Sequence, residues 1–281
     1  MNPSVPKSPL WLLLPAVILV LISSCISDAD RAACRIDTAR GMIAEGRYSA
    51  AKLQLDTVDL LYPRCIEQRQ QARHLKDTVM LLEAERTLQY NDSLLRQLQP
   101  KADSLVALFR YEKNEKYQSR GYYIHPALMS QNNVSGCFLQ AEVGDDTQLV
   151  IRSFYFGNVE LDHTLIRISA GDDYANLTGS NHHFYADGHH EITTCMSEHC
   201  AEALRFVAGR VEDKVTVVLG SDNKRHSYTL TAANKKALAQ TLELFYALTD
   251  IKRLEQTISF ANSQIMLAEK RLNENPTRNP K

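Results

Sequence analysis

The chain has 281 residues, and 44% of them are hydrophobic, which is enough to build a core and more than one substructure. The net charge is −1, and the lysines and arginines are scattered along the sequence. Because the sequence contains no basic patch of the kind that binds nucleic acid, its composition indicates no nucleic-acid partner.

The first 24 residues have the pattern of a signal peptide. Lys7 precedes an apolar run of 13 residues, Leu10 to Ile22, which is short for a transmembrane span but typical of a signal peptide. The run ends in LISSC at 21–25, and this ending resembles the lipobox of bacterial lipoproteins. The alternatives are an ordinary signal peptide with an incidental cysteine, or an anchor that is not cleaved.

The resemblance to cell-envelope lipoproteins implies a fate for Cys25. In those proteins the lipobox cysteine is acylated and becomes the mature N-terminus, and its acyl chains together anchor it firmly in a lipid bilayer. An aspartate directly after the cysteine can retain such proteins at the inner membrane, whereas this chain has Ile26. The resemblance therefore implies an exported protein, lipid-anchored in the bacterial cell envelope at the outer membrane.

Residues 25–64 predict a helical hairpin, with helices over 28–45 and 48–62. The spacing of seven residues at about 34–63 resembles one tetratricopeptide repeat: Ala39, Gly46, Tyr48, Ala51, Leu55, Val58 and Pro63. Because such repeats are usually stable only when they are stacked, a single copy favours a packed hairpin over a peptide-binding array.

Two apolar stripes with a period of 3.5 residues predict long helices over 65–111 and 231–273. The stripe over 244–272 has no polar interruption, and the stripe over 81–109 includes one polar member, Asn91. Two long helices separated by a domain pair most simply with each other. We therefore expect an antiparallel coiled-coil stalk.

Two further expectations concern these helices. Pro100 lacks a backbone donor and clashes with the preceding turn, so it predicts a kink or break near Gln99. The alternative to the stalk is an oligomer, in which each stripe pairs with another copy of the chain.

Residues 112–230 predict a compact, mostly antiparallel β-rich module inserted between the two helices. A short helix is expected at 198–209, and residues 274–281 are expected to form a disordered tail. Runs rich in β-branched and aromatic residues, separated by turns such as Gly144-Asp145-Asp146, lie at 150–156, 165–168, 215–219 and 228–230. The fold class is therefore α+β, with a helical hairpin, a long coiled coil and an inserted β module.

A histidine- and cysteine-rich stretch at 182–200 suggests a metal site. Imidazole and thiolate are the ligands that zinc prefers, and the candidate ligands are His189, His190, Cys195 and Cys200. The spacing matches no zinc motif, and two adjacent histidines on a strand point to opposite faces. The first interpretation of this stretch is therefore a solvated hairpin that binds no cofactor. The alternative is that the stretch binds zinc, either in a metal-binding protein or in a metal-dependent hydrolase.

The cysteines also allow disulfides, because an exported protein meets an oxidising compartment. Cys195 and Cys200 are one natural pair, and Cys34 and Cys65 are the other. With Cys25 acylated, Cys137 is left over.

The sequence carries no complete catalytic motif, because Gly-x-Ser-x-Gly, a phosphate loop and a dinucleotide fingerprint are all absent from it. It therefore predicts a non-enzymatic lipoprotein whose β module contacts an envelope protein or a glycan. The aromatic residues expected at that contact are Tyr122, Tyr123, Phe154 and Tyr155.

Overall fold

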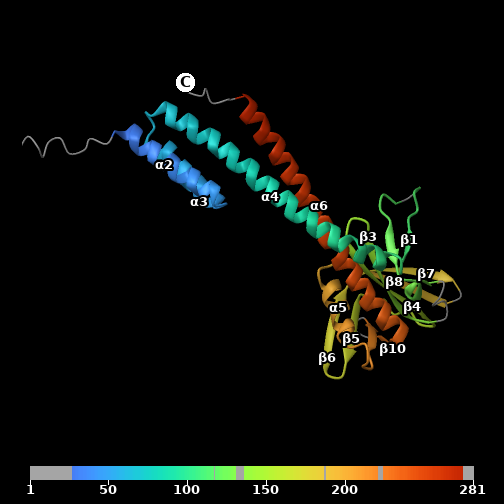
Figure 1. Ribbon diagram of the computed structural model, residues 1–281. Helices are drawn as coiled ribbons and strands as arrows, with labels where there is room; N and C mark the ends of the chain where they lie inside the picture. Colours follow the sequence, from blue (N-terminus) through green and yellow to red (C-terminus); the bar gives the residue numbers. More distant parts are fainter. Residues whose placement is uncertain (1–26, 117, 131–135, 187, 221–223, 275–281) are drawn as a thin grey trace, which may run out of the picture. The chain divides into compact units, whose positions relative to one another are not determined.

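The computed structural model describes residues 27–116, 118–130, 136–186, 188–220 and 224–274 (Figure 1). The predicted signal peptide at 1–24, the lipidation site Cys25 and most of the predicted tail lie outside these residues. The described chain divides into two compact units, one formed by the residues up to Gln89 and from Ser259, the other by Tyr90–Ile258. Among the described helices, none is both long enough and apolar enough to span a membrane.

The first unit begins with the predicted helical hairpin, made of α2 (Asp28–Ala44) and α3 (Tyr48–Leu61). A capping box starts α2, because the hydroxyl of Ser27 accepts from the backbone N–H of Asp30 at 3.1 Å while the Asp30 carboxylate accepts from the Ser27 N–H at 3.2 Å. Gly46 turns the chain between the helices with a left-handed φ of 72°, a conformation that glycine adopts without strain.

The core of the first unit lies among α2, α3 and the start of α4 (Ile66–Val106). Small residues let the helices approach closely, and larger aliphatic side chains fill the remaining space. Its fully buried members are Ala32, Ile36, Ala39, Ala51, Leu55, Val58, Ala72 and Val79. Four of the residues that suggested the repeat, Ala39, Ala51, Leu55 and Val58, are thus core residues.

The two predicted long helices are present as α4 and α6 (Ala232–Glu274). Within the first unit they run antiparallel, since Arg271 of α6 contacts Asp77 near the start of α4 whereas Phe260 shares a cavity with Thr87. The predicted seam of α6 is largely buried, at Leu244, Ile251, Leu254, Ala261 and Ala268. The predicted break at Pro100 is wrong, because α4 continues through this residue to Val106, while the kink near Gln99 stays a prediction.

The second unit contains two antiparallel sheets. The large sheet has the order β1-β2-β3-β4-β8-β7, and the small sheet has the order β10-β9-β5-β6. The strands are β1 (Arg110–Glu112), β2 (Tyr122–Ile124), β3 (Phe138–Gly144), β4 (Leu149–Gly157), β5 (Leu165–Ala170), β6 (Asp173–Thr178), β7 (Ser180–Ala186), β8 (Gly188–Cys195), β9 (Thr216–Gly220) and β10 (Arg225–Thr229). A short helix η1 (Pro126–Leu128) follows β2.

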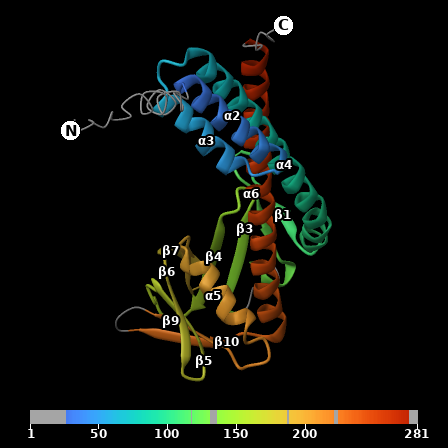
Figure 2. The same cartoon turned by 60° about the vertical axis from the view of Figure 1, so that its left-hand side comes forward.

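One hydrophobic core serves both sheets of this unit. It joins Ile151 of the large sheet to Ile166 and Leu219 of the small sheet, together with Leu204 of α5 (His199–Ala208) and Leu238 of α6. Helix α5 lies against β4 and β6 (Figure 2). The α+β class, with a helical hairpin, a long helix pair and an inserted antiparallel β module, is confirmed.

The register of the large sheet separates its side chains onto two faces, because residues paired across antiparallel strands point to the same side. One side, the core face, carries Leu139, Ile151, Ser153, Glu191 and Cys195. The other side, here called the polar face, carries Tyr122, Gln140, Glu142, Arg152 and Thr194.

Candidate functional site

The polar face carries a cavity of about 340 Å³ over strands β1 to β4. Its walls come from the large sheet and from the segment that follows β1. The lining residues are Glu112, Lys113, Asn114, Gln118, Tyr122, Ile124, Gln140, Glu142 and Arg152. Among the lining residues of this Glu142 cavity, only Ile124 is wholly aliphatic.

A turn at 144–148 sets the geometry of the cavity. It closes with a hydrogen bond from the backbone N–H of Gly144 to the carbonyl of Gln148 at 2.8 Å and joins β3 to β4. Asp145 in this turn accepts from the Tyr111 hydroxyl and from the Gly121 N–H, both at 3.0 Å. The turn therefore also ties down β1 and the start of β2, which wall the cavity.

Glu142 is the buried group at the centre of the cavity wall. Its Oε1 accepts from the Gln140 Nε2 at 2.7 Å and also from the Arg152 guanidinium. Its Oε2 is buried and has no hydrogen-bond partner among the described residues. The Glu142 side chain is 1% exposed, so bulk water does not compensate that oxygen.

The electrostatics of Glu142 follow from this incomplete bonding. Burial raises the pKa of the carboxyl, and the Arg152 charge and the two hydrogen bonds offset this rise only in part. A hydrogen-bond donor placed on Oε2 would complete the carboxylate. The arrangement is thus suited to holding a polar ligand.

A second buried polar cluster lies on the core face of the same sheet. The Nδ1 of His163 lies 2.8 Å from Oε2 of Glu191, and its Nε2 lies 3.2 Å from the Ser153 hydroxyl. Burial lowers the pKa of His163 more than the Glu191 carboxylate raises it, which favours the uncharged ring at neutral pH. The order serine, histidine, carboxylate matches that of a nucleophilic triad.

This Ser153–His163–Glu191 chain has no access for a substrate. Ser153 and His163 are both 0% exposed, and Ser153 lies within β4 between two neighbouring strands. The carboxylate of Glu191 also accepts from the backbone N–H groups of Leu161, Asp162 and His163 at 2.5 to 3.0 Å. These contacts fasten the segment before β5 to the large sheet, which is a structural role.

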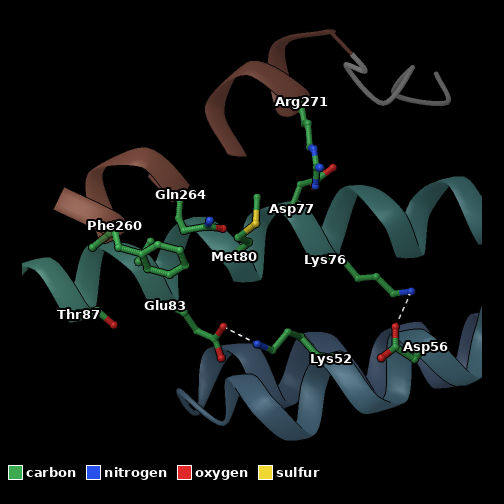
Figure 3. A pocket seen from close by; sticks show the side chains of 12 residues that line it. Lys52, Asp56, Lys76, Asp77, Met80, Glu83, Thr87, Phe260, Gln264 and Arg271 are labelled. Carbon is green, nitrogen blue, oxygen red and sulfur yellow. Dashed lines mark hydrogen bonds and ion pairs between the residues drawn. The ribbon is translucent and has the colours of Figure 1, made fainter. Parts of the chain in front are cut away.

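The first unit has a groove of about 440 Å³ among α3, α4 and α6 (Figure 3). Lys52 pairs with Glu83 at 2.6 Å, Lys76 with Asp56 at 2.7 Å and Arg271 with Asp77 at 3.4 Å. Its charged groups are therefore already paired with one another. No unsatisfied buried group of the kind found at Glu142 is recorded among its lining residues, all of which the structure describes.

The structure separates the predicted metal ligands. His189 and His190 lie at one end of β8 and Cys195 at the other, six residues away, a distance of about 20 Å along a strand. Cys200 lies near Cys195, since its thiol donates to the Cys195 carbonyl at 3.4 Å. Within the described ranges, no group of three or more histidine, cysteine, aspartate or glutamate side chains is placed to hold a metal ion.

The cysteines are free thiols throughout the part of the chain that the structure describes. Cys34 is exposed, Cys65 is half-buried, and Cys195 and Cys200 are both buried. Burial raises the pKa of Cys195 to about 12, so this thiol is not reactive. The two disulfides, Cys34–Cys65 and Cys195–Cys200, stay predictions.

The four aromatic contact candidates are divided between the two faces. Tyr122 and Phe154 lie on the polar face, and Tyr122 lines the Glu142 cavity. Phe154 stacks on Phe138 with ring centroids 4.4 Å apart. Tyr123 and Tyr155 lie on the core face, where Tyr155 is buried and donates to the Val159 carbonyl at 2.9 Å. Of the four, Tyr122 belongs to the candidate site.

Sequence reasoning missed Gln140 and Glu142. Their strand, FLQAEVG, carries a carboxylate in a position that the structure buries, against the usual rule for acidic residues. One signal was present, since Arg152 interrupts the apolar run VIRSFYF of a predicted strand. A charged residue within such a strand indicates a residue of opposite charge on the neighbouring strand.

Comparisons with protein families, with curated proteins and with solved structures find no match for this chain.

Proposed function

We propose that this protein is a non-enzymatic lipoprotein of the bacterial cell envelope, anchored through Cys25, whose β-rich module binds a polar partner in the Glu142 cavity. The anchor rests on the LISSC sequence at 21–25. The binding role rests on one observation: Glu142 lines a cavity of polar side chains, and its buried Oε2 has no hydrogen-bond partner among the described residues.

The hydrogen bonding of the buried Glu142 carboxylate is incomplete among the described residues. A buried acceptor without a donor costs stability, so such groups in proteins usually have a function or an unseen partner. A ligand donor would remove this penalty upon binding, and the neighbouring Arg152 keeps the carboxylate in place. Specificity would follow, because a ligand without that donor leaves Oε2 unpaired.

The anchor is tested by replacing the lipidated residue. In cells that carry the protein with its own leader, the unaltered chain should incorporate labelled palmitate and Cys25→Ser should not, because the thiol that carries the acyl chain is lost. Equal labelling of the two proteins, or none of either, would show that Cys25 is not a lipid anchor.

The binding role is tested by photo-crosslinking in the same cells. Tyr122, in the cavity, is replaced by p-benzoylphenylalanine, and the matched control carries the same replacement at Tyr174. Tyr174 is exposed on the small sheet, outside the cavity. An adduct of defined mass should form from position 122 only and should be lost when Arg152→Ala is added. Equal adducts from both positions, or none from either, would refute the role.

A further inference from the structure

We infer that the ligand of the Glu142 cavity is a neutral oligosaccharide, which continues across Arg152 into a second cavity on the same face of the sheet. This inference rests on the proposed binding role and specifies its ligand class. Its basis is the pattern of unused donors and acceptors, the charge of the cavity, and the continuity of two cavities through one arginine.

The lining of the cavity contains both hydrogen-bond donors and acceptors. The oxygens of Asn114 and Gln118 already accept from the backbone N–H groups of Lys116 and Asn114, at 3.2 and 2.9 Å. Their amide nitrogens therefore remain as donors within the described structure. Oε2 of Glu142 and the amide oxygen of Gln140 remain as acceptors there. A hydroxyl group donates and accepts at one atom, so a hydroxyl-rich ligand satisfies both kinds of group.

The charges of the cavity cancel. Two acidic residues, Glu112 and Glu142, line the cavity together with two basic residues, Lys113 and Arg152, so a ligand with a net charge would gain no complementary field. A purely cationic ligand would also leave the amide donors unused, and an anion would leave Oε2 of Glu142 unpaired. A neutral ligand avoids both penalties.

A second cavity of about 670 Å³ adjoins the first on the polar face. Arg152 lines both cavities, and the second is otherwise lined mainly by small or hydroxyl-bearing residues, including Thr178, Ser180, Thr194 and Ser197. Arg152 pairs directly with Gln140 on β3 and with Thr194 on β8, so the two cavities lie on consecutive strands. A linear chain of sugar units can follow this direction across the strands.

The size of the first cavity also favours short units. About 340 Å³ lies at the low end of ligand sites, enough for one or two sugar rings but not for a folded segment of protein. Tyr122 adds a flat amphipathic side chain at its wall.

The experiment measures binding and its dependence on chain length. The full lipidated protein, in a detergent that carries no sugar, is titrated calorimetrically with cello-, malto-, manno-, xylo- and chito-oligosaccharides of one to four units. At least one series should bind, and its tetramer should bind about tenfold or more tightly than its dimer, because only the longer chain reaches hydroxyls in the second cavity.

Two variants locate the binding. Glu142→Gln keeps the shape of the side chain but can place an amide nitrogen, which donates, where Oε2 would accept from the ligand. It should therefore weaken the binding of both the dimer and the tetramer about tenfold. Thr194→Val removes a hydroxyl from the second cavity and should weaken the tetramer alone. The matched controls are Glu243→Gln, exposed on α6, and Thr216→Val, half-buried on β9, neither of which should change the affinity.

The failures are distinguishable. If no saccharide binds while position 122 still yields a crosslinked adduct, the glycan class is wrong and the binding role stands. If a neutral tetrapeptide such as Ser-Asn-Gly-Ser binds in the cavity in place of every saccharide, the glycan class is likewise wrong. If no saccharide binds and no adduct forms, the binding role and this inference both fall.

Discussion

Two buried glutamates on opposite faces of the large sheet show how bonding decides the role of a residue. Glu191 accepts hydrogen bonds at both carboxylate oxygens, from three backbone N–H groups, the His163 ring and the Asn181 amide. Glu142 accepts hydrogen bonds from the described residues at only one of its two carboxylate oxygens. We therefore assign Glu191 to the stability of the fold and Glu142 to binding, although both are buried carboxylates of the same sheet.

The structural role of Glu191 leads to a prediction. Both carboxylate oxygens of Glu191 accept hydrogen bonds, so in Glu191→Gln the amide nitrogen replaces one acceptor with a donor. The variant should therefore lose about 3 kcal/mol of unfolding free energy at neutral pH. Urea denaturation followed by circular dichroism measures this loss, with Glu243→Gln as the control. A variant as stable as the unaltered protein would show that the cluster does not hold the sheet together.

The same residue predicts a loss of stability in acid. Burial raises the pKa of Glu191, but its hydrogen bonds from His163, Asp162 and Leu161 outweigh burial and lower the pKa from 4.5 to about 2. A lowered pKa gives stability that is present above the ordinary value and is lost as the pH falls from 4.5 toward 2. The pKa of His163 is also lowered, so its contribution to stability is lost as the pH falls below the ordinary pKa of 6.5. Urea midpoints between pH 7 and pH 3 should fall more steeply for the unaltered protein than for Glu191→Gln.

At the level of elements, the helices and strands such as β4, β5 and β9 could be predicted from the sequence, whereas β1, β2, β3 and β6 could not. Helices with a strict apolar stripe, such as α6, and β-branched strands, such as β4 and β9, carry a local signal. Strand β3 contains Gln140 and Glu142, which look like surface residues until Arg152 of β4 is placed beside them. The cavity that they line arises from pairing between strands, so periodicity along one segment does not reveal it.

Pro100 does not break α4, for a physical reason of the same kind. A proline removes one helical hydrogen bond locally, yet α4 continues to Val106, with the Ser104 hydroxyl donating to the Pro100 carbonyl at 2.8 Å. Leu105 and Val106 pack against the core of the second unit. Such tertiary packing outweighs the local preference.

The junction between β6 and β7 gives a prediction at this scale. A Cβ added to Gly179 would lie 2.4 Å from the Thr194 carbonyl oxygen and 2.8 Å from the Cys195 sulfur, so Gly179→Ala forces β7 away from β8. We expect it to destabilise the second unit by about 2 kcal/mol. Thermal unfolding measures this change. Gly209→Ala is the matched control, since its nearest neighbour would lie at 3.6 Å, and equal melting temperatures for both variants would contradict the clash.

At the level of the whole molecule, the two units differ in whether the polar groups beside their cavities have partners. The charged groups of the groove in the first unit pair with one another, whereas the second unit holds a buried acceptor beside its cavity. We therefore place the binding role in the second unit. The first unit, which follows the proposed anchor in the chain, serves in this account as the connection to the membrane.

Hydrogen–deuterium exchange of the lipidated protein, with and without a soluble extract of the cell envelope, locates the binding surface. We expect slower exchange in β2, β3 and the neighbouring part of β4, around Tyr122, Glu142 and Arg152. Exchange in β9 and β10, and in α3 beside the groove, should not change. Protection confined to the groove of the first unit, or no protection anywhere, would contradict the claim that the β module binds its partner through the Glu142 cavity.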